Sequence, residues 1–217
     1  TDFLQTQQKP FRVLSTDRRI ANPNLLSAYN IESVSGYDPL YLKKYATFVT
    51  AWQSNKTNNS NTSFNRFVTP DNYKSQLANL MNVDYVLTFD DIVTPGFEKV
   101  LDEGSTKLYK NNNALNRVFF VNQIIKKESE QDVLDSLANQ TDFTKIAYSS
   151  SFKFEGGDLG AKAGITKYSD QSIVINTTTS DPTPLIISNI NYPGWKGYVD
   201  DSEVKIENVN YLMQSIV

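Results

Sequence analysis

The chain contains 217 residues, of which 39% are hydrophobic and 21% charged, and its formal net charge is −3. This composition excludes disorder as the main state, and the small negative charge argues against a nucleic-acid partner. Histidine and cysteine are both absent, which excludes disulfides, Ser-His-Asp catalysis and metal sites built from these residues. We expect no cofactor and no metal ion. No apolar run in the sequence reaches the roughly 18 residues of a membrane span.

The first quarter of the chain predicts a strand, a loop region and a helix. Residues 11–15 read as a strand, and residues 16–36 as mostly loop with a helical turn near 25–29. Asp38 and Pro39 fit the N-cap and first position of a helix. Aromatic residues then recur every three or four positions, as on one helix face: Tyr37, Tyr41, Tyr45, Phe48 and Trp52. We expect this stripe to pack in the core, with stacking on sugar rings as the alternative.

The rest of the chain falls into two regions with different predicted secondary structure. Up to about residue 142 we expect an exposed, mobile loop at 53–66, a helix from 69 to 82, strands at 84–89, 107–110 and 117–122, and a helix at 130–139 capped by Ser129. Beyond residue 143 we expect only short strands separated by Asp, Gly, Pro and Ser, at 145–150, 153–155, 162–168, 172–178, 184–189, 197–199, 203–206 and 211–217.

The predicted fold class is therefore α+β, with two parts packed together. Residues 1–142 form a mixed α/β N-terminal part, and residues 143–217 form an antiparallel, jelly-roll-like β-sandwich. The chain begins with Thr1 and looks like a piece of a longer protein.

Three stretches, taken in order, resemble one protein family. They are Arg12-Val13-Leu14 with Asn24-Leu25-Leu26 and Gly36-Tyr37-Asp38-Pro39-Leu40, then residues 82–87 with 108–111 and 114–121, and finally residues 192–200. The ordered set is similar to the C-terminal extracytoplasmic region of YfhO-like bacterial membrane proteins, which resemble GT-C glycosyltransferases. The resemblance implies a domain at the extracytoplasmic face of the cell membrane, with the transmembrane part of its own parent chain as a partner.

The resemblance also implies what the chain does. YfhO-like proteins are associated with sugar decoration of lipoteichoic acid in Gram-positive bacteria, and GT-C enzymes carry their catalytic carboxylates near transmembrane helices that this chain lacks. We therefore expect no catalytic residue here, and a role in binding a cell-envelope glycopolymer for a glycosyltransferase that uses lipid-linked sugar. The chain departs from the family pattern at Asn116 and Asp201, so no role is carried over to either position.

Four polar or amphipathic residues of these stretches are candidates for ligand binding: Arg12, Asn24, Tyr37 and Arg117. Arginine supplies paired donors for phosphate, whereas Asn and Tyr suit sugar hydroxyls. Ion pairs that hold the two parts together are the competing role for the two arginines.

A structural motif is expected at Pro193-Gly194-Trp195, followed by a hairpin turn at Asp200. We expect Pro193 and Gly194 to turn the chain and Trp195 to be mostly buried, with a ligand platform as the alternative. Calcium binding at residues 200–203 and acid–base catalysis by Asp90 and Asp91 are weaker hypotheses than a solvated turn and loop acids.

Two other functions remain open at this level. The chain is alternatively a carbohydrate-binding or adhesion module of a secreted surface protein, or a free-standing hydrolase that depends on carboxylates. Apolar spans upstream of Thr1 in the full-length gene would favour the membrane-protein assignment.

Overall fold

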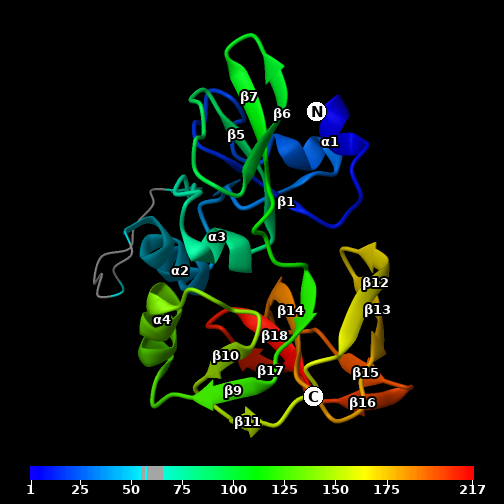
Figure 1. Cartoon of the computed structure of the whole chain (residues 1–217). Coiled ribbons are helices and arrows are strands. Elements are labelled where there is room, and N and C mark those ends of the chain that lie inside the picture. The colour runs from blue at the N-terminus through cyan, green and yellow to red at the C-terminus, as the bar shows by residue number, and fades with distance from the viewer. Residues whose placement is uncertain (55–56, 58–65) are drawn as a thin grey trace. The chain divides into compact units, whose positions relative to one another are not determined.

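The computed structural model describes residues 1–54, 57 and 66–217, and most of the loop predicted at 53–66 lies outside them. The chain divides into a first unit, Thr1–Leu115, and a second unit, Asn116–Val217 (Figure 1). Helices and predominantly antiparallel sheets coexist, so the predicted α+β class is confirmed. Within the described residues, no helix is long and apolar enough to cross a membrane.

The division between the units falls at residues 115 and 116 and not at the predicted 142 and 143. Strand pairing explains the difference. Strand β8 (Val118–Phe120) pairs with β14 (Leu185–Ile190), and β9 (Gln123–Lys126) pairs in parallel with β10 (Ile146–Ser149). The segment before residue 142 is therefore tied by hydrogen bonds to strands that follow it.

The first unit is built on a five-stranded mixed sheet with the strand order β2-β1-β5-β7-β6. Strand β1 runs parallel to β2 and β5, whereas β7 is antiparallel to β5 and β6. The elements of this unit are α1 (Asp2–Gln5), β1 (Arg12–Ser15), η1 (Leu26–Tyr29), β2 (Glu32–Ser33), β3 (Gly36–Tyr37), α2 (Lys43–Ser54), β4 (Phe67–Val68), α3 (Gln76–Leu80), β5 (Val83–Thr88), β6 (Phe97–Glu103) and β7 (Thr106–Asn111).

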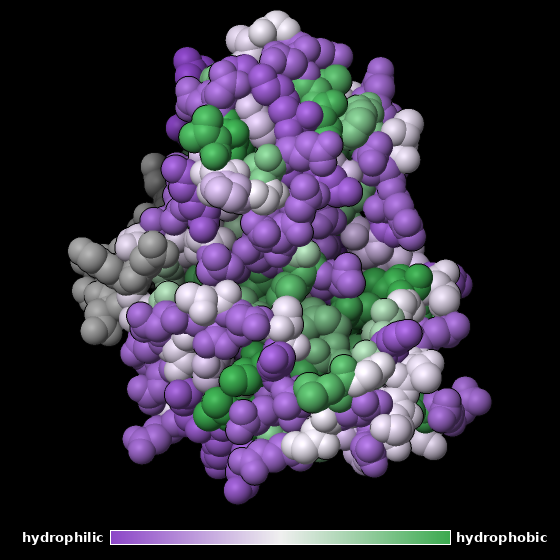
Figure 2. All heavy atoms as spheres, viewed as in Figure 1, coloured by the Kyte–Doolittle hydropathy of each residue, from purple (hydrophilic) through white to green (hydrophobic). Residues whose placement is uncertain are grey.

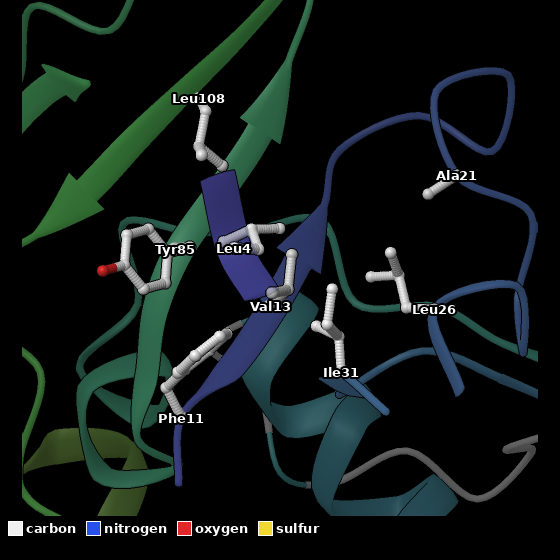
Figure 3. Packing of buried hydrophobic residues seen from close by; sticks show 8 residues of the cluster. All are labelled: Leu4, Phe11, Val13, Ala21, Leu26, Ile31, Tyr85 and Leu108. Carbon is white, nitrogen blue, oxygen red and sulfur yellow. The ribbon is translucent and has the colours of Figure 1, made fainter. Parts of the chain in front are cut away.

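Apolar side chains from α1, the sheet and the 21–31 region pack together in the first unit (Figure 3). The cluster comprises Leu4, Phe11, Val13, Ala21, Leu26, Ile31, Tyr85 and Leu108. Phe11 meets the edge of the Tyr85 ring with the centroids 5.0 Å apart. The loop-like stretch before β2 is held in place because it contributes Leu26 and Ile31 to this core.

Both predicted helices of the first unit are shorter than expected. Helix α2 begins at Lys43 because Asp38 caps a local turn, accepting a hydrogen bond from the Leu40 amide at 2.7 Å. Helix α3 has only five residues and begins after Ser75, whose hydroxyl accepts from the Leu77 amide at 3.2 Å. The Asp38-Pro39 signal therefore marks a turn before α2 and not the first residues of that helix.

The second unit contains a four-stranded sheet, β17-β18-β14-β8, a three-stranded sheet, β10-β9-β11, and two hairpins. Its remaining elements are α4 (Glu130–Asn139), β11 (Phe154–Glu155), β12 (Lys162–Ser169), β13 (Ser172–Thr178), β15 (Gly197–Val199), β16 (Ser202–Val204), β17 (Glu207–Val209) and β18 (Met213–Ile216). Helix α4 connects the parallel strands β9 and β10 and is capped by Ser129 as predicted.

The layered packing of the second unit follows from the alternation of exposed and partly buried residues along the β12–β13 hairpin. Ile165 and Ile173 belong to the partly buried side of that hairpin and pack on Val118, Leu185 and Ile187 of the larger sheet. Two β-layers with an apolar interior are the arrangement of a sandwich, as predicted.

Hydrophilic residues cover most of the face seen in Figure 2, and apolar residues form smaller patches on it.

Candidate functional site

A pocket of 370 Å³ opens beside the β15–β16 hairpin of the second unit. This volume falls within the range of about 300–1,000 Å³ that is usual for small-molecule sites. Two segments line it: Asn191, Tyr192, Pro193, Gly194, Trp195, Lys196 and Gly197 on one side, and Glu203, Val204, Lys205 and Ile206 on the other. It combines two aromatic rings with an amide and charged side chains.

Local sequence explains how the pocket walls are held. Gly194 has φ +106°, a conformation that favours glycine, and it turns the chain after Pro193. Gly197 is buried, and a Cβ atom there would lie 2.9 Å from Ile216 Cδ1 and 3.1 Å from Ile206 Cγ1. The backbone of the hairpin therefore sits close against these isoleucines only because Gly197 has no side chain.

The turn of the hairpin is formed by Asp200 and Asp201, between the paired residues Val199 and Ser202. Their φ angles are 46° and 67°, which is the geometry of a two-residue type I′ turn. The predicted turn at Asp200 is confirmed, and Asp201 adopts the positive φ that a glycine would take at that place. None of the described residues gather into an acidic group that could hold a metal ion.

The exposed groups of the pocket suit a polar ligand with an apolar face. Tyr192 is 55% exposed, and Trp195 is partly exposed beside it. Lys196 and Glu203 face each other with Nζ and Oε1 3.7 Å apart. Aromatic rings pack against the C–H faces of sugars, and the lysine and glutamate supply donors and acceptors for hydroxyls.

Trp195 is mostly buried, as predicted, and the part of it that stays exposed lines the pocket. The fully buried residue of this segment is Gly197, and strand β18 together with Ile206 packs directly on it. Trp195 lies two residues earlier, after the Pro193-Gly194 turn, where it lines the pocket.

Two of the predicted ligand-binding residues, Asn24 and Tyr37, contact each other in the first unit. The Asn24 amide donates to the Tyr37 carbonyl at 2.8 Å and accepts from the Tyr37 amide at 3.0 Å. Asn24 itself has φ 71°. Its side chain therefore fixes the start of β3, while the Tyr37 ring remains 40% exposed against Phe67, with centroids 4.7 Å apart.

Arg12 is buried within the first unit. Its Nη1 donates to the Met81 carbonyl at 2.8 Å, and its Nε lies 3.5 Å from Glu32 Oε2. These contacts join β1 to β2 and to the end of α3, which gives Arg12 the ion-pairing role that competes with ligand binding. The ion pair lies within one unit and does not require a second.

Arg117 is only 3% exposed and belongs to the second unit. Its Nη1 donates to the Tyr168 hydroxyl at 2.7 Å and to Asn189 Oδ1 at 3.2 Å, and its guanidinium lies 5.4 Å from the centre of the Tyr168 ring. Within this unit the side chain links β12 to the end of β14.

Asp90 and Asp91 lie in the loop after β5, where Asp91 holds a cluster of donors. Lys107 and Tyr109 donate to its two carboxylate oxygens at 3.0 and 3.1 Å, and Lys99 Nζ lies 3.0 Å away. The hydrogen bond from Lys107, followed by those from Lys99 and Tyr109, lowers the pKa of Asp91 from 3.8 to about 2. Asp91 therefore supports the β6–β7 hairpin as a loop acid.

We expect Asp91→Asn to flatten the acid limb of the stability curve. The lowered pKa means that Asp91 contributes stability above pH 3.8, and that this contribution is lost as the pH falls through about 2. Urea unfolding at a series of pH values will check this. An unchanged slope between these two pH values in the variant would contradict it.

The aromatic pocket was not predicted as a site, although its residues were singled out as a motif. The usable signal was the density of Tyr192, Trp195 and Tyr198 around a Pro-Gly turn. Comparison of the chain with protein-family models, with curated proteins and with solved structures gives no match.

Proposed function

We propose that this chain is a non-catalytic, glycan-binding domain from the extracytoplasmic region of a YfhO-like, GT-C-type membrane protein. Its pocket beside the β15–β16 hairpin would hold the acceptor glycopolymer while the membrane part of the parent transfers sugar. The assignment to this parent rests on the resemblance of the three sequence stretches. The assignment of glycan binding rests on the pocket.

The observation that carries the binding proposal is the exposure of Tyr192 and Trp195 in a concave site. Apolar surface gathered in a concave site and rimmed by polar residues is a common mark of a ligand-binding groove. A sugar ring offers an apolar C–H face for Tyr192 or Trp195 and hydroxyls for the Lys196–Glu203 pair. Weak affinity is sufficient in a tethered domain, because tethering raises the effective concentration of the polymer.

A matched pair of tyrosines tests the binding. Tyr192 and Tyr198 are 55% and 56% exposed, but only Tyr192 lines the pocket. We expect Tyr192→Ala to weaken binding at least about tenfold, because a hot-spot aromatic contact is lost. Tyr198→Ala should leave it unchanged. Chemical-shift titration with methyl glycosides of neutral hexoses and with glycerol-phosphate oligomers measures both.

Two results would contradict the proposal. The first is an absence of shifts at the pocket at millimolar concentrations of every probe. The second is an equal loss of binding in the two tyrosine variants, which would place the ligand elsewhere. Apolar spans encoded upstream of Thr1 bear separately on the assignment to a membrane parent, since a secreted module would lack them.

A further inference from the structure

A second exposed surface lies on the first unit, around the turn that precedes α2. Leu40 is 87% exposed, and Leu25, Tyr37 and Leu42 are between 38% and 45% exposed. We call this surface the Leu40 patch. It comprises Leu25, Tyr37, Leu40, Leu42 and Phe67 together with Arg18, Lys43 and Arg66.

Contacts between distant segments assemble the Leu40 patch. The Tyr37 ring packs on Phe67, and the Arg18 guanidinium lies 4.7 Å from the centre of the Phe67 ring. The Asp38 amide donates to the Arg66 carbonyl at 3.0 Å, which brings the start of β4 beside the turn. The Asn24 side chain fastens the Leu25 end to Tyr37.

The charge of the patch is opposite to that of the chain. Arg18 stacks on Phe67, Arg66 precedes Phe67, and Lys43 follows Leu42, with Lys44 next in the sequence and Asp38 as the acid in the turn. The chain as a whole carries −3. Exposed cations therefore lie next to protruding apolar side chains in this part of the chain.

We propose that the Leu40 patch binds the surface of an anionic lipid bilayer, with Leu40 entering the interface and the basic residues meeting lipid phosphates. A lipid surface accepts a protruding leucine without a shaped pocket and attracts the neighbouring cations. This proposal is independent of glycan binding, which uses the other unit.

Vesicle co-sedimentation of the whole chain tests the proposal. Vesicles of phosphatidylglycerol and phosphatidylcholine in equal parts should bind the chain at low salt, and high salt should release it. Vesicles of phosphatidylcholine alone should bind it much less. We expect Leu40→Ser to weaken partitioning about tenfold, the effect of losing one buried leucine side chain.

Matched control variants distinguish specific lipid binding by the Leu40 patch from a nonspecific loss of binding. Val93, which is 93% exposed in the same unit, provides the apolar control Val93→Ser. The pair Arg18→Gln and Lys43→Gln should together weaken binding at least about tenfold, because two cations that attract the anionic surface are lost. Lys110→Gln, at an exposed lysine of β7, should not. Thermal melts confirm that each variant is folded.

Several outcomes would overturn the proposal. They are an absence of binding to phosphatidylglycerol vesicles, equal binding to neutral vesicles, and unchanged binding of Leu40→Ser. Light scattering adds a fourth. A dimer of the chain that is lost in Leu40→Ser would mean that a second copy, and not lipid, covers the patch.

Discussion

Replacing Trp52 by alanine is expected to lower the free energy of unfolding by about 3–5 kcal/mol, the usual cost of truncating a buried tryptophan. The side chain is fully buried in α2, meets the edge of the Phe48 ring at 6.4 Å, and donates from Nε1 to the Asn72 carbonyl at 2.8 Å. The substitution leaves both a cavity and a carbonyl without its donor. Urea denaturation monitored by circular dichroism measures the loss.

Trp195→Ala is the matched control. Trp195 is partly exposed in the pocket, so its removal leaves less of a cavity. We expect a cost of about 1–2 kcal/mol, within the range of ordinary substitutions. Equal costs for the two variants would contradict the assignment of Trp52 to the core and Trp195 to the pocket.

The second large effect is expected at Gly157, which precedes β12 in the second unit. A Cβ atom there would lie 2.9 Å from the Asn122 Cα and 3.1 Å from the Val121 carbonyl oxygen. Both are backbone atoms of the segment between β8 and β9, and neither can move aside as a flexible side chain would. We expect Gly157→Ala to destabilise the chain by about 1–3 kcal/mol, the usual cost of overpacking, or more.

Gly164 in β12 provides the control for this substitution. A Cβ atom at Gly164 would meet nothing within 4 Å. We expect Gly164→Ala to be neutral or to stabilise by about 0.4–1 kcal/mol, because it reduces the entropy of the unfolded chain. Differential scanning calorimetry of both variants distinguishes a contact effect at Gly157 from a general effect of losing glycine.

The predicted aromatic stripe illustrates how far periodicity reaches. Phe48 and Trp52 are buried on one face of α2, as the spacing predicts. Tyr37 belongs instead to β3, where it pairs with Phe67. Tyr45 lies in α2 and donates to the Val34 carbonyl at 2.6 Å, and its burial raises its pKa to about 12. The aromatic spacing therefore runs on from β3 into α2, although the helix itself begins only at Lys43.

The strands of the second unit were predicted more accurately than the helix boundaries of the first unit. The expected strands at 172–178 and 197–199 coincide with β13 and β15. Alternation has a period of two residues, so a short run is enough to show it, and turn residues delimit each run. Strand β6 (Phe97–Glu103) was missed, because its partly exposed and exposed residues leave little apolar alternation.

The sequence by itself determined the α+β class, most strands after residue 143, the Ser129 cap and the turn at Asp200. These features depend on neighbouring residues, whose conformational preferences act locally. Only the tertiary structure decided that the units divide at residue 115, that Arg12 and Arg117 are buried, and that Trp195 lines a pocket. Burial depends on which distant strand covers a side chain, and strand partners far apart in the chain leave no periodic signal.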